Sequence, residues 1–354
     1  MDFQISDDRR MLADTLRRYL SEQYGIEHRN RVAYEAPWHD PSKWTDLAEL
    51  GLFHAFASED HGGMGGAGFD IAVVFEELGR ALCPEPVLGQ LMAIRLIGAA
   101  GGNLAPLLDG THRYAVGLGE LDSPYDLSAM TTRADGTALT GRKSVVYGGG
   151  AADRLLIATH DLGLWQIAAT DAEIASYGMI DGGPAAEVFV DNTPATLRLA
   201  DARAAIAEAL DWGALALCAE ALGAMEAAYG MLVDYLGTRR QFGKPIGSFQ
   251  ALQHRAVDLS IEIEQARSIV ILAAAAMDTP DRARRASQAK HLVGRIARQV
   301  AEEVIQMHGG IAMTWEYPAS HYAKRLVMID HQLGDTDWHL ERLMDLLQAE
   351  RTGP

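Results

Sequence analysis

Between two long helical patterns the chain reads Arg239-Arg240-Gln241-Phe242-Gly243-Lys244-Pro245-Ile246-Gly247-Ser248-Phe249-Gln250. Apolar residues recur at helical spacing on both sides of this charged break, over residues 204–236 and 249–277. A third helical pattern, residues 287–308, ends in Gln306-Met307-His308-Gly309-Gly310. Each pattern is long for a helix of a globular protein, so the C-terminal part of the chain is predicted to form a helical bundle.

The sequence upstream of the bundle divides into two further parts. Ser6 can cap a first helix, and residues 44–52 and 71–82 have the periodicity of others. The pattern changes at His112, after which short apolar segments alternate with Gly-rich turns, as in strands. Asp135-Gly136 is predicted to be a hairpin turn. We therefore predict a mainly α fold with a central β domain: an N-terminal helical domain (1–111), a middle β domain (112–198) and a C-terminal helical bundle (199–354).

The composition excludes several classes of function. The 354 residues are 48% hydrophobic and 22% charged, as in an ordinary globular protein, and the net charge of -17 argues against nucleic-acid or anionic membrane partners. Cys83 and Cys218 lie in no metal or redox motif, and no His residues stand at ligand spacing, so no metal site is predicted. The N-terminus has no basic and apolar leader, and no uninterrupted apolar run is long enough to span a membrane. We expect a cytoplasmic protein.

A glycine run, residues 63–68, matches the G-x-G-x-x-G pattern of dinucleotide-binding folds. That fold requires a buried strand directly before the glycines, whereas residues 56–61 are largely polar here. The run is therefore predicted to be a loop.

The break at residues 239–250 and the Gln306–Gly310 motif, followed by Trp315-Glu316-Tyr317-Pro318, together resemble the acyl-CoA dehydrogenases, a family of FAD enzymes. The resemblance covers Ser6 to Leu347 and implies that the C-terminal bundle has four helices. Within the family, residues 218–226, 248–258 and 321–326 are similar to the small subunit of pimeloyl-CoA dehydrogenase. That subunit is paired with a distinct large subunit.

The resemblance implies FAD as the cofactor and an acyl-CoA as the substrate. It assigns cofactor binding to seven residues: Arg239, Gln241, Phe242, Gln250, Gln306, Gly309 and Gly310. Arg239 would pair with the pyrophosphate of a neighbouring subunit's FAD, because a guanidinium matches phosphate oxygens. Phe242 would pack on the adenine side, and Asp211 matches an Asp near the pantetheine. Each motif also has a structural interpretation, since basic residues suit a helix C-terminus, glycines cap helices and an Asp suits a helix N-terminus.

The residue that performs proton abstraction in the family is missing. These enzymes remove the α-proton of the thioester with a Glu, while the β-hydrogen leaves as hydride to the flavin. Aligned from Tyr317-Pro318, that position is Leu333, which cannot accept a proton. Some relatives place the base on the first long helix of the bundle, and the matching residue here is Gly213.

Glu220 follows Gly213 by nearly two helical turns, so it lies on the same side of the helix. It is either a displaced catalytic base or a structural carboxylate paired with an Arg of a neighbouring helix, such as Arg255 or Arg267. We favour the structural interpretation.

The middle domain also departs from the family. The flavin-facing Trp-x-Thr segment corresponds to Val145-Val146-Tyr147, so the isoalloxazine contacts are altered while the adenosine contacts are kept. We expect an FAD-dependent α,β-dehydrogenase subunit in a heterotetramer, with a paralogous acyl-CoA dehydrogenase subunit supplying the base and electron-transfer flavoprotein as acceptor. The alternatives are a homotetramer that uses Glu220 and a catalytically silent flavin- or CoA-binding scaffold. Dicarboxylyl, medium-chain and steroid side-chain thioesters all fit the sequence.

Overall fold

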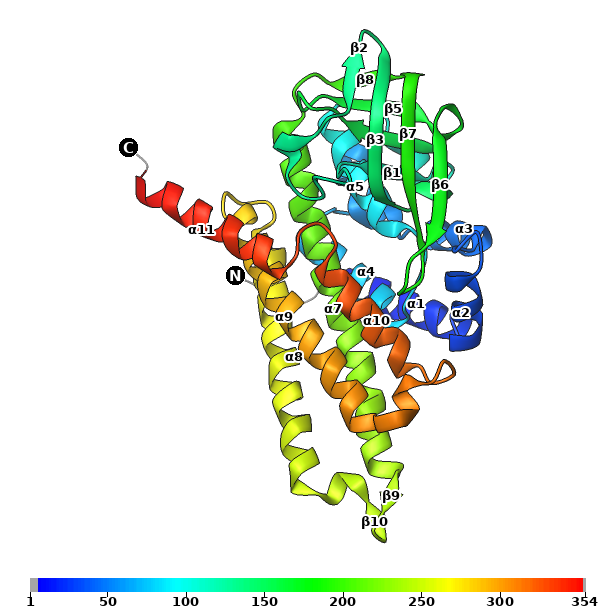
Figure 1. Cartoon of the computed structure of the whole chain (residues 1–354), viewed down its shortest axis with the longest axis vertical. Coiled ribbons are helices and arrows are strands. Elements are labelled where there is room, and N and C mark those ends of the chain that lie inside the picture. The colour runs from blue at the N-terminus through cyan, green and yellow to red at the C-terminus, as the bar shows by residue number, and fades with distance from the viewer. Residues whose placement is uncertain (1–5, 353–354) are drawn as a thin grey trace. The chain divides into compact units, whose positions relative to one another are not determined.

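The computed structural model describes residues 6–352, in which helices precede and follow a β-rich middle part (Figure 1). The helices before the strands are α1 (Asp7–Gln23), α2 (Ile26–Tyr34), α3 (Pro41–Glu49), α4 (Gly68–Arg80), α5 (Val87–Ala99) and α6 (Ala105–Leu108). Ser6 caps α1 as predicted, because its hydroxyl accepts the backbone N–H of Arg9. The glycine run at 63–68 forms no strand–helix unit, and the segment before it, Glu59–His61, is a 3₁₀ turn.

The chain forms two compact units, each of which is built from separated segments. One unit combines residues 6–26 and 71–83 with residues 214–352, and the other combines residues 27–70 with 84–213. The predicted domain boundaries near residues 111 and 198 stay predictions.

Two four-stranded sheets form the middle part. Their strands are β1 (Tyr114–Gly117), β2 (Arg133–Asp135), β3 (Ala138–Tyr147), β4 (Arg154–Ala158), β5 (Leu164–Ala168), β6 (Glu173–Gly178), β7 (Pro184–Pro194) and β8 (Thr196–Leu199). The order is β1-β4-β5-β8 in one sheet and β2-β3-β7-β6 in the other. Asp135 pairs with Ala138 across Gly136, whose φ of 60° confirms the predicted hairpin turn. Apolar residues from both sheets, including Leu139 and Ile157, share one core.

Long helices dominate the C-terminal part. They are α7 (Arg203–Thr238), α8 (Gln250–Ala276), α9 (Arg282–His308), α10 (Ala319–Asp330) and α11 (Thr336–Thr352), with a small hairpin of β9 (Arg240–Gln241) and β10 (Lys244–Pro245) after α7. Among the described residues, α7 alone is long and apolar enough to cross a membrane, and 67% of its most apolar window is buried, as in the core helix of a globular protein.

Helix α4 approaches α7 closely through two glycines. A Cβ atom on Gly79 would lie 1.9 Å from the carbonyl oxygen of Glu220, and one on Gly223 would lie 1.9 Å from that of Glu76. No larger residue fits at either position without separating the helices. The N-terminal helix α4 is therefore an integral part of the unit that contains the C-terminal bundle.

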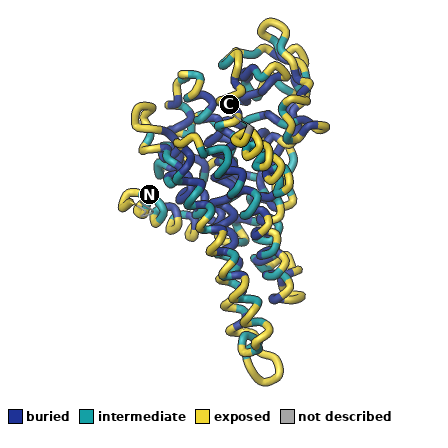
Figure 2. The backbone as a smooth tube through the Cα atoms, turned by 90° about the vertical axis from the view of Figure 1, so that its left-hand side faces the viewer, coloured by how far each residue is buried: buried dark blue, intermediate teal, exposed yellow. Residues whose placement is uncertain are grey.

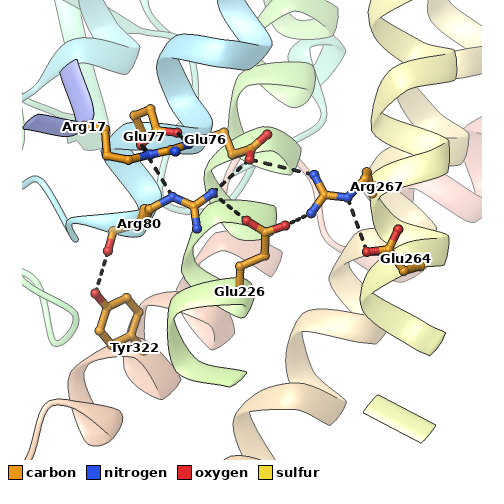
Figure 3. A network of polar contacts seen from close by, with 8 residues as sticks. All are labelled: Arg17, Glu76, Glu77, Arg80, Glu226, Glu264, Arg267 and Tyr322. Carbon is orange, nitrogen blue, oxygen red and sulfur yellow. Dashed lines mark hydrogen bonds and ion pairs between the residues drawn. The ribbon is translucent and has the colours of Figure 1, made fainter. Parts of the chain in front are cut away.

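A network of ion pairs joins α1, α4, α7 and α8 beside this crossing (Figure 3). Arg17 of α1 binds both carboxylate oxygens of buried Glu77, at 2.6 and 2.9 Å. Arg80 of α4 contacts Glu226 of α7 at 2.5 Å, and Arg267 of α8 binds the same carboxylate. The network satisfies charges that the close helix packing would otherwise leave buried and unpaired.

Candidate functional site

The hairpin between α7 and α8 presents the first group of predicted site residues. Gln241 pairs with Lys244, and the two residues between them, Phe242 and Gly243, have φ angles of 52° and 79°. Positive φ at both turn positions is the geometry that fits a tight hairpin. Phe242 is 89% exposed, and the ring contact that it makes is with Phe249, edge to face at 6.0 Å between centroids. The turn thus holds a large aromatic ring in solvent.

Polar side chains flank this ring. The backbone N–H of Arg239 donates to the carbonyl oxygen of Tyr235 at 2.8 Å, which extends the last turn of α7. The Arg239 side chain is exposed, and across residues 6–352 its guanidinium has no ion-pair partner. Gln241 and Gln250 are exposed as well. An unpaired cation, two amides and an aromatic ring therefore lie within one twelve-residue segment.

The C-terminal end of α9 presents the second group. Gln306, Gly309 and Gly310 are all exposed, and Gly309 has a φ of 71°. A Cβ atom at either glycine would meet no atom of the described chain within 4 Å. Open space above two glycines permits a ligand to approach the backbone closely. The hairpin forms the exposed lower end of the bundle (Figures 1 and 2), and the glycine turn directly follows His308, whose ring contacts Tyr235 one helical turn before Arg239.

The turn after α10 carries Leu333, the residue that the sequence resemblance aligns with the family's base. Leu333 has a φ of 56°, which is unusual for a branched side chain, and Gly334 follows with 98°. The ammonium group of buried Lys290 donates to the carbonyl oxygens of Ile329, Asp330 and Gly334 at 2.8–2.9 Å. These three acceptors match the three N–H donors of a lysine.

Sequence reasoning did not single out Lys290. A signal was present, because Lys290 falls on the face of α9 that also carries buried Ala286, Val293 and Ala297. A charged residue on an apolar helical face requires buried partners. Burial lowers the pKa of Lys290 to about 8, while Cys218 and Asp330 act in the opposite direction.

Glu220 is held in a buried, two-pronged ion pair. Its two carboxylate oxygens accept from Nε and an Nη of Arg325 in α10, at 2.6 and 2.9 Å. The predicted partners were wrong: Arg255 pairs with Glu303, and Arg267 belongs to the network of Figure 3. The prediction of an Arg on a neighbouring helix was right in kind, but the helix is α10 rather than α8.

Asp211 and Gly213 lie near the start of α7, in the unit that contains the sheets. Asp211 is buried, with 1% of its surface exposed, and its neighbour Trp212 is fully buried. The Arg95 guanidinium stacks over the Trp212 ring at 3.6 Å from its centroid and donates to the carbonyl oxygen of Gly66. Arg95 thereby ties the glycine-rich loop to this end of α7.

In the sheet, the segment aligned with the family's flavin contacts contains a bulge. Val145 has a φ of 51° at a register shift between β3 and β7, and its N–H donates to Glu187 at 3.3 Å. Glu187 also accepts from Arg142 and from the hydroxyl of Tyr177. The Glu187 carboxylate therefore accepts the backbone N–H that the bulge exposes.

A buried ion pair joins the loop between β1 and β2 to strand β3. The Glu120 carboxylate accepts from Lys143 at 2.9 Å and from backbone and hydroxyl groups of Thr131 and Thr132. Burial alone would raise the pKa of Glu120, but these five donors hold it well below its usual range. The carboxylate is saturated with donors, which suits a structural role. No cluster of three or more potential metal ligands occurs within residues 6–352.

Comparisons with known proteins agree with this arrangement. Residues 203–347 match the model "Acyl-CoA dehydrogenase, C-terminal domain", and residues 6–101 match "Acyl-CoA dehydrogenase, N-terminal domain". The chain is 32% identical to acyl-CoA dehydrogenase IpdE2 of Mycobacterium tuberculosis over 328 residues, covering 90% of this chain and 91% of that protein.

Solved structures extend the likeness to three dimensions. A steroid acyl-CoA dehydrogenase variant, Tcur3481-Tcur3483 G363A, superimposes with a TM-score of 0.89 at 28% identity, covering 98% of this chain and 99% of that chain. A chain of the ChsE4-ChsE5 complex of Mycobacterium tuberculosis has the same fold, with a TM-score of 0.88 at 22% identity and full coverage of both chains (100% and 100%). Other structures with this fold contain FADH2 or FAD. The chain therefore belongs to the acyl-CoA dehydrogenases, a family of FAD-dependent oxidoreductases, and has their fold.

Proposed function

We propose that this chain is the partner subunit of a heteromeric acyl-CoA dehydrogenase. It contributes the adenosine side of an FAD site to a paralogous subunit, and that subunit supplies the catalytic base for α,β-dehydrogenation of an acyl-CoA thioester. The observation that carries the proposal is the contrast between two regions of the chain. The base position is Leu333, whereas the exposed end of the bundle keeps Arg239, Gln241 and Phe242 available.

The exposed end of the bundle fits the nucleotide part of FAD. Arg239 has no ion pair within the described chain, so its guanidinium can bind pyrophosphate oxygens. Phe242 offers a ring face for adenine, and Gly309 and Gly310 leave room for close backbone approach. FAD, when bound, supplies the acceptor for the hydride that leaves the acyl chain. Every one of these side chains points into solvent, which suits a ligand that a neighbouring subunit shares.

Three positions were candidates for the base, and none offers a free carboxylate. Leu333 and Gly213 have no proton acceptor in their side chains. Glu220 has a carboxylate, but both of its oxygens are engaged by Arg325. With both oxygens bound to the Arg325 guanidinium, the carboxylate is not free to contact a substrate carbon unless that pair is broken. We therefore assign the base to the partner subunit.

The chain retains one means of contacting the thioester. The turn at Leu333 keeps a defined backbone geometry, and its N–H is proposed to donate to the thioester oxygen as negative charge develops there. The heteromeric ChsE4-ChsE5 complex shows that the fold occurs in assemblies of two different chains. Electron-transfer flavoprotein is the proposed electron acceptor, and Asp211 the proposed pantetheine contact.

Visible absorption spectra of the chain alone and of its complex with the paralogous subunit test the proposal. We expect a colourless lone chain and a yellow complex with about one flavin for every two chains. Full flavin occupancy and turnover by the lone chain would show that it is self-sufficient.

Two variants distinguish a shared site from a scaffold. Arg239→Ala and Phe242→Ala should each release flavin from the complex without dissociating the subunits. Arg18→Ala is the matched control. It removes an exposed guanidinium of α1, away from the hairpin, and the complex should keep its flavin. Retention of flavin in both hairpin variants would mean that this chain only stabilises its partner.

A further inference from the structure

Three aromatic rings meet at the end of the bundle where the proposed nucleotide site lies. The ring of His308 lies 4.8 Å from that of Tyr235 with 35° between the planes, and 5.1 Å from that of Tyr317 with 60°. Tyr235 and Tyr317 also contact each other, edge to face at 6.4 Å. Each ring thus touches both of the others. Nothing in the proposed function uses these residues.

Each ring belongs to a different segment of the site. Tyr235 lies one helical turn before Arg239, and its carbonyl oxygen binds the Arg239 N–H at 2.8 Å. His308 is the last residue of α9 and directly precedes Gly309. Tyr317 follows the 3₁₀ turn Gly309–Met313 and precedes α10. The cluster therefore joins the segment that begins the hairpin to both sides of the glycine turn.

His308 is anchored at the centre of the cluster. Only 3% of its surface is exposed, and Nδ1 lies 2.8 Å from the carbonyl oxygen of Val304, so Nδ1 carries the proton and donates. Nε2 has no hydrogen-bond partner among the described residues. Burial lowers the pKa of His308, and the hydrogen bond to the Val304 carbonyl oxygen opposes this effect. Burial raises the pKa of Tyr317, and the charges of Tyr235 and Asp234 act in the same direction.

The two segments of the proposed nucleotide site have little other packing to hold them at a fixed distance from each other. Residues 239–244 and residues 309–311 are exposed, so no core packs against either segment of the site. His308 is the buried residue adjacent to the glycine turn, and its contact with Tyr235 reaches the helix that ends at the hairpin. The contacts of His308 with Tyr235 and Tyr317 therefore connect the end of α7, which leads into the hairpin, to the segments on both sides of the glycine turn.

We propose that Tyr235, His308 and Tyr317 form a positioning cluster, which sets the spacing between the Arg239 segment and the Gly309-Gly310 turn so that both can hold one nucleotide. This inference rests on the proposed function, because it assumes that the two segments bind the same FAD. His308 acts through its neighbours and does not itself touch the cofactor.

The test compares two substitutions of similar size in the complex of this chain with its partner. His308→Leu removes the ring, whereas His308→Phe keeps it and removes only the bond to Val304. Two aromatic contacts are worth enough to change a dissociation constant by about tenfold. We expect His308→Leu to weaken FAD binding by about tenfold, as measured by flavin titration of the apo complex, and His308→Phe to restore it to within about threefold. Tyr317→Leu, which removes a ring without touching the end of α9, should weaken binding in the same direction.

Val300→Ala is the control for general destabilisation. Val300 is fully buried on α9, two helical turns before His308. It should lower the thermal midpoint without changing FAD affinity. The inference is wrong if His308→Leu binds FAD as tightly as wild type, if His308→Phe is as weak as His308→Leu, or if Val300→Ala weakens FAD equally. Arg239→Ala separates the two proposals: normal FAD affinity in that variant overturns the shared site itself, whereas a weakened Arg239→Ala beside a normal His308→Leu overturns only the positioning role.

Discussion

The pair between Glu220 and Arg325 yields the sharpest prediction, because its two interpretations predict opposite phenotypes. The Glu220 side chain is 8% exposed and that of Arg325 is 14% exposed, and two hydrogen bonds of 2.6 and 2.9 Å join them. Removing one member of a buried ion pair costs about 3–5 kcal/mol, since the other charge stays buried without compensation. In Glu220→Gln the amide oxygen still accepts one hydrogen bond, so we expect a loss of about 3 kcal/mol in the free energy of unfolding.

Urea unfolding of the purified complex measures this loss, and a double-mutant cycle isolates the pair. Arg325→Met alone should also destabilise, whereas the double variant should lose less than the sum, with a coupling energy of about 2 kcal/mol. Glu303→Gln is the matched control. It breaks the more exposed pair with Arg255 and should cost less than about 1 kcal/mol.

Single-turnover reduction of flavin by acyl-CoA supplies the decisive comparison. The structural interpretation predicts that folded Glu220→Gln reduces flavin at the wild-type rate in the complex. The reasoning would be refuted by a variant of wild-type stability that keeps its flavin and no longer reduces it. That outcome would make Glu220 the base and the chain self-sufficient.

Three further predictions concern packing, the turn at the base position and pH. Gly79→Ala should lower the free energy of unfolding by more than about 3 kcal/mol, because the new methyl group would lie 1.9 Å from the carbonyl oxygen of Glu220. Gly230→Ala is the control, since Gly230 has open space around it. In the same urea assay that variant should be neutral or more stable by up to about 1 kcal/mol. Lys290→Met removes three hydrogen bonds and takes the Lys290 donor from the buried carbonyl oxygens of Asp330 and Gly334, while that of Ile329 keeps the N–H of Gln332; it should cost about 3 kcal/mol, and a change below about 1 kcal/mol would contradict the assigned bonds. Burial lowers the pKa of His339 from 6.5 to about 3, so the unfolded chain binds more protons between these values and stability falls as pH drops through that window. The loss from pH 7 to pH 5 should be about 2 kcal/mol, and His339→Asn should lack it in paired urea curves at the two pH values.

The long helices could be predicted from the sequence because their periodicity persists over many turns. The pattern at 249–277 corresponds to α8, Gln250–Ala276. Strand β6, Glu173–Gly178, was missed for a physical reason: it is an edge strand with no fully buried residue, and the partly buried Ile174 that packs on the core is too little to give an alternating apolar pattern. For strand β2, at the other edge of the same sheet, the turn that follows was predicted but not the extent of the strand, which likewise has no fully buried residue.

The site was harder to predict where it depends on contacts between helices. The exposed motif residues could be located from local patterns, since Phe242 and Gly243 define their own turn. The partner of Glu220 could not, because Arg255, Arg267 and Arg325 all lie on helices of the same bundle and periodicity does not rank them. The cluster around His308 has no sequence signal, because its three rings come from segments up to 82 residues apart, from Tyr235 to Tyr317.

The left-handed backbone at Leu333 has a consequence for engineering. The contacts that fix this turn come from outside it, from the ammonium of Lys290 and from His339, whose Nε2 lies 3.1 Å from the Leu333 carbonyl oxygen. Residue 333 itself can therefore change without remodelling the loop, and a glutamate introduced there would leave the main chain along the same bond vector as the present leucine. If the chain is the partner subunit proposed above, a Leu333→Glu variant would test whether restoring a carboxylate at this turn is enough for autonomous dehydrogenation, or whether the segment at Val145 and Tyr147 must change as well.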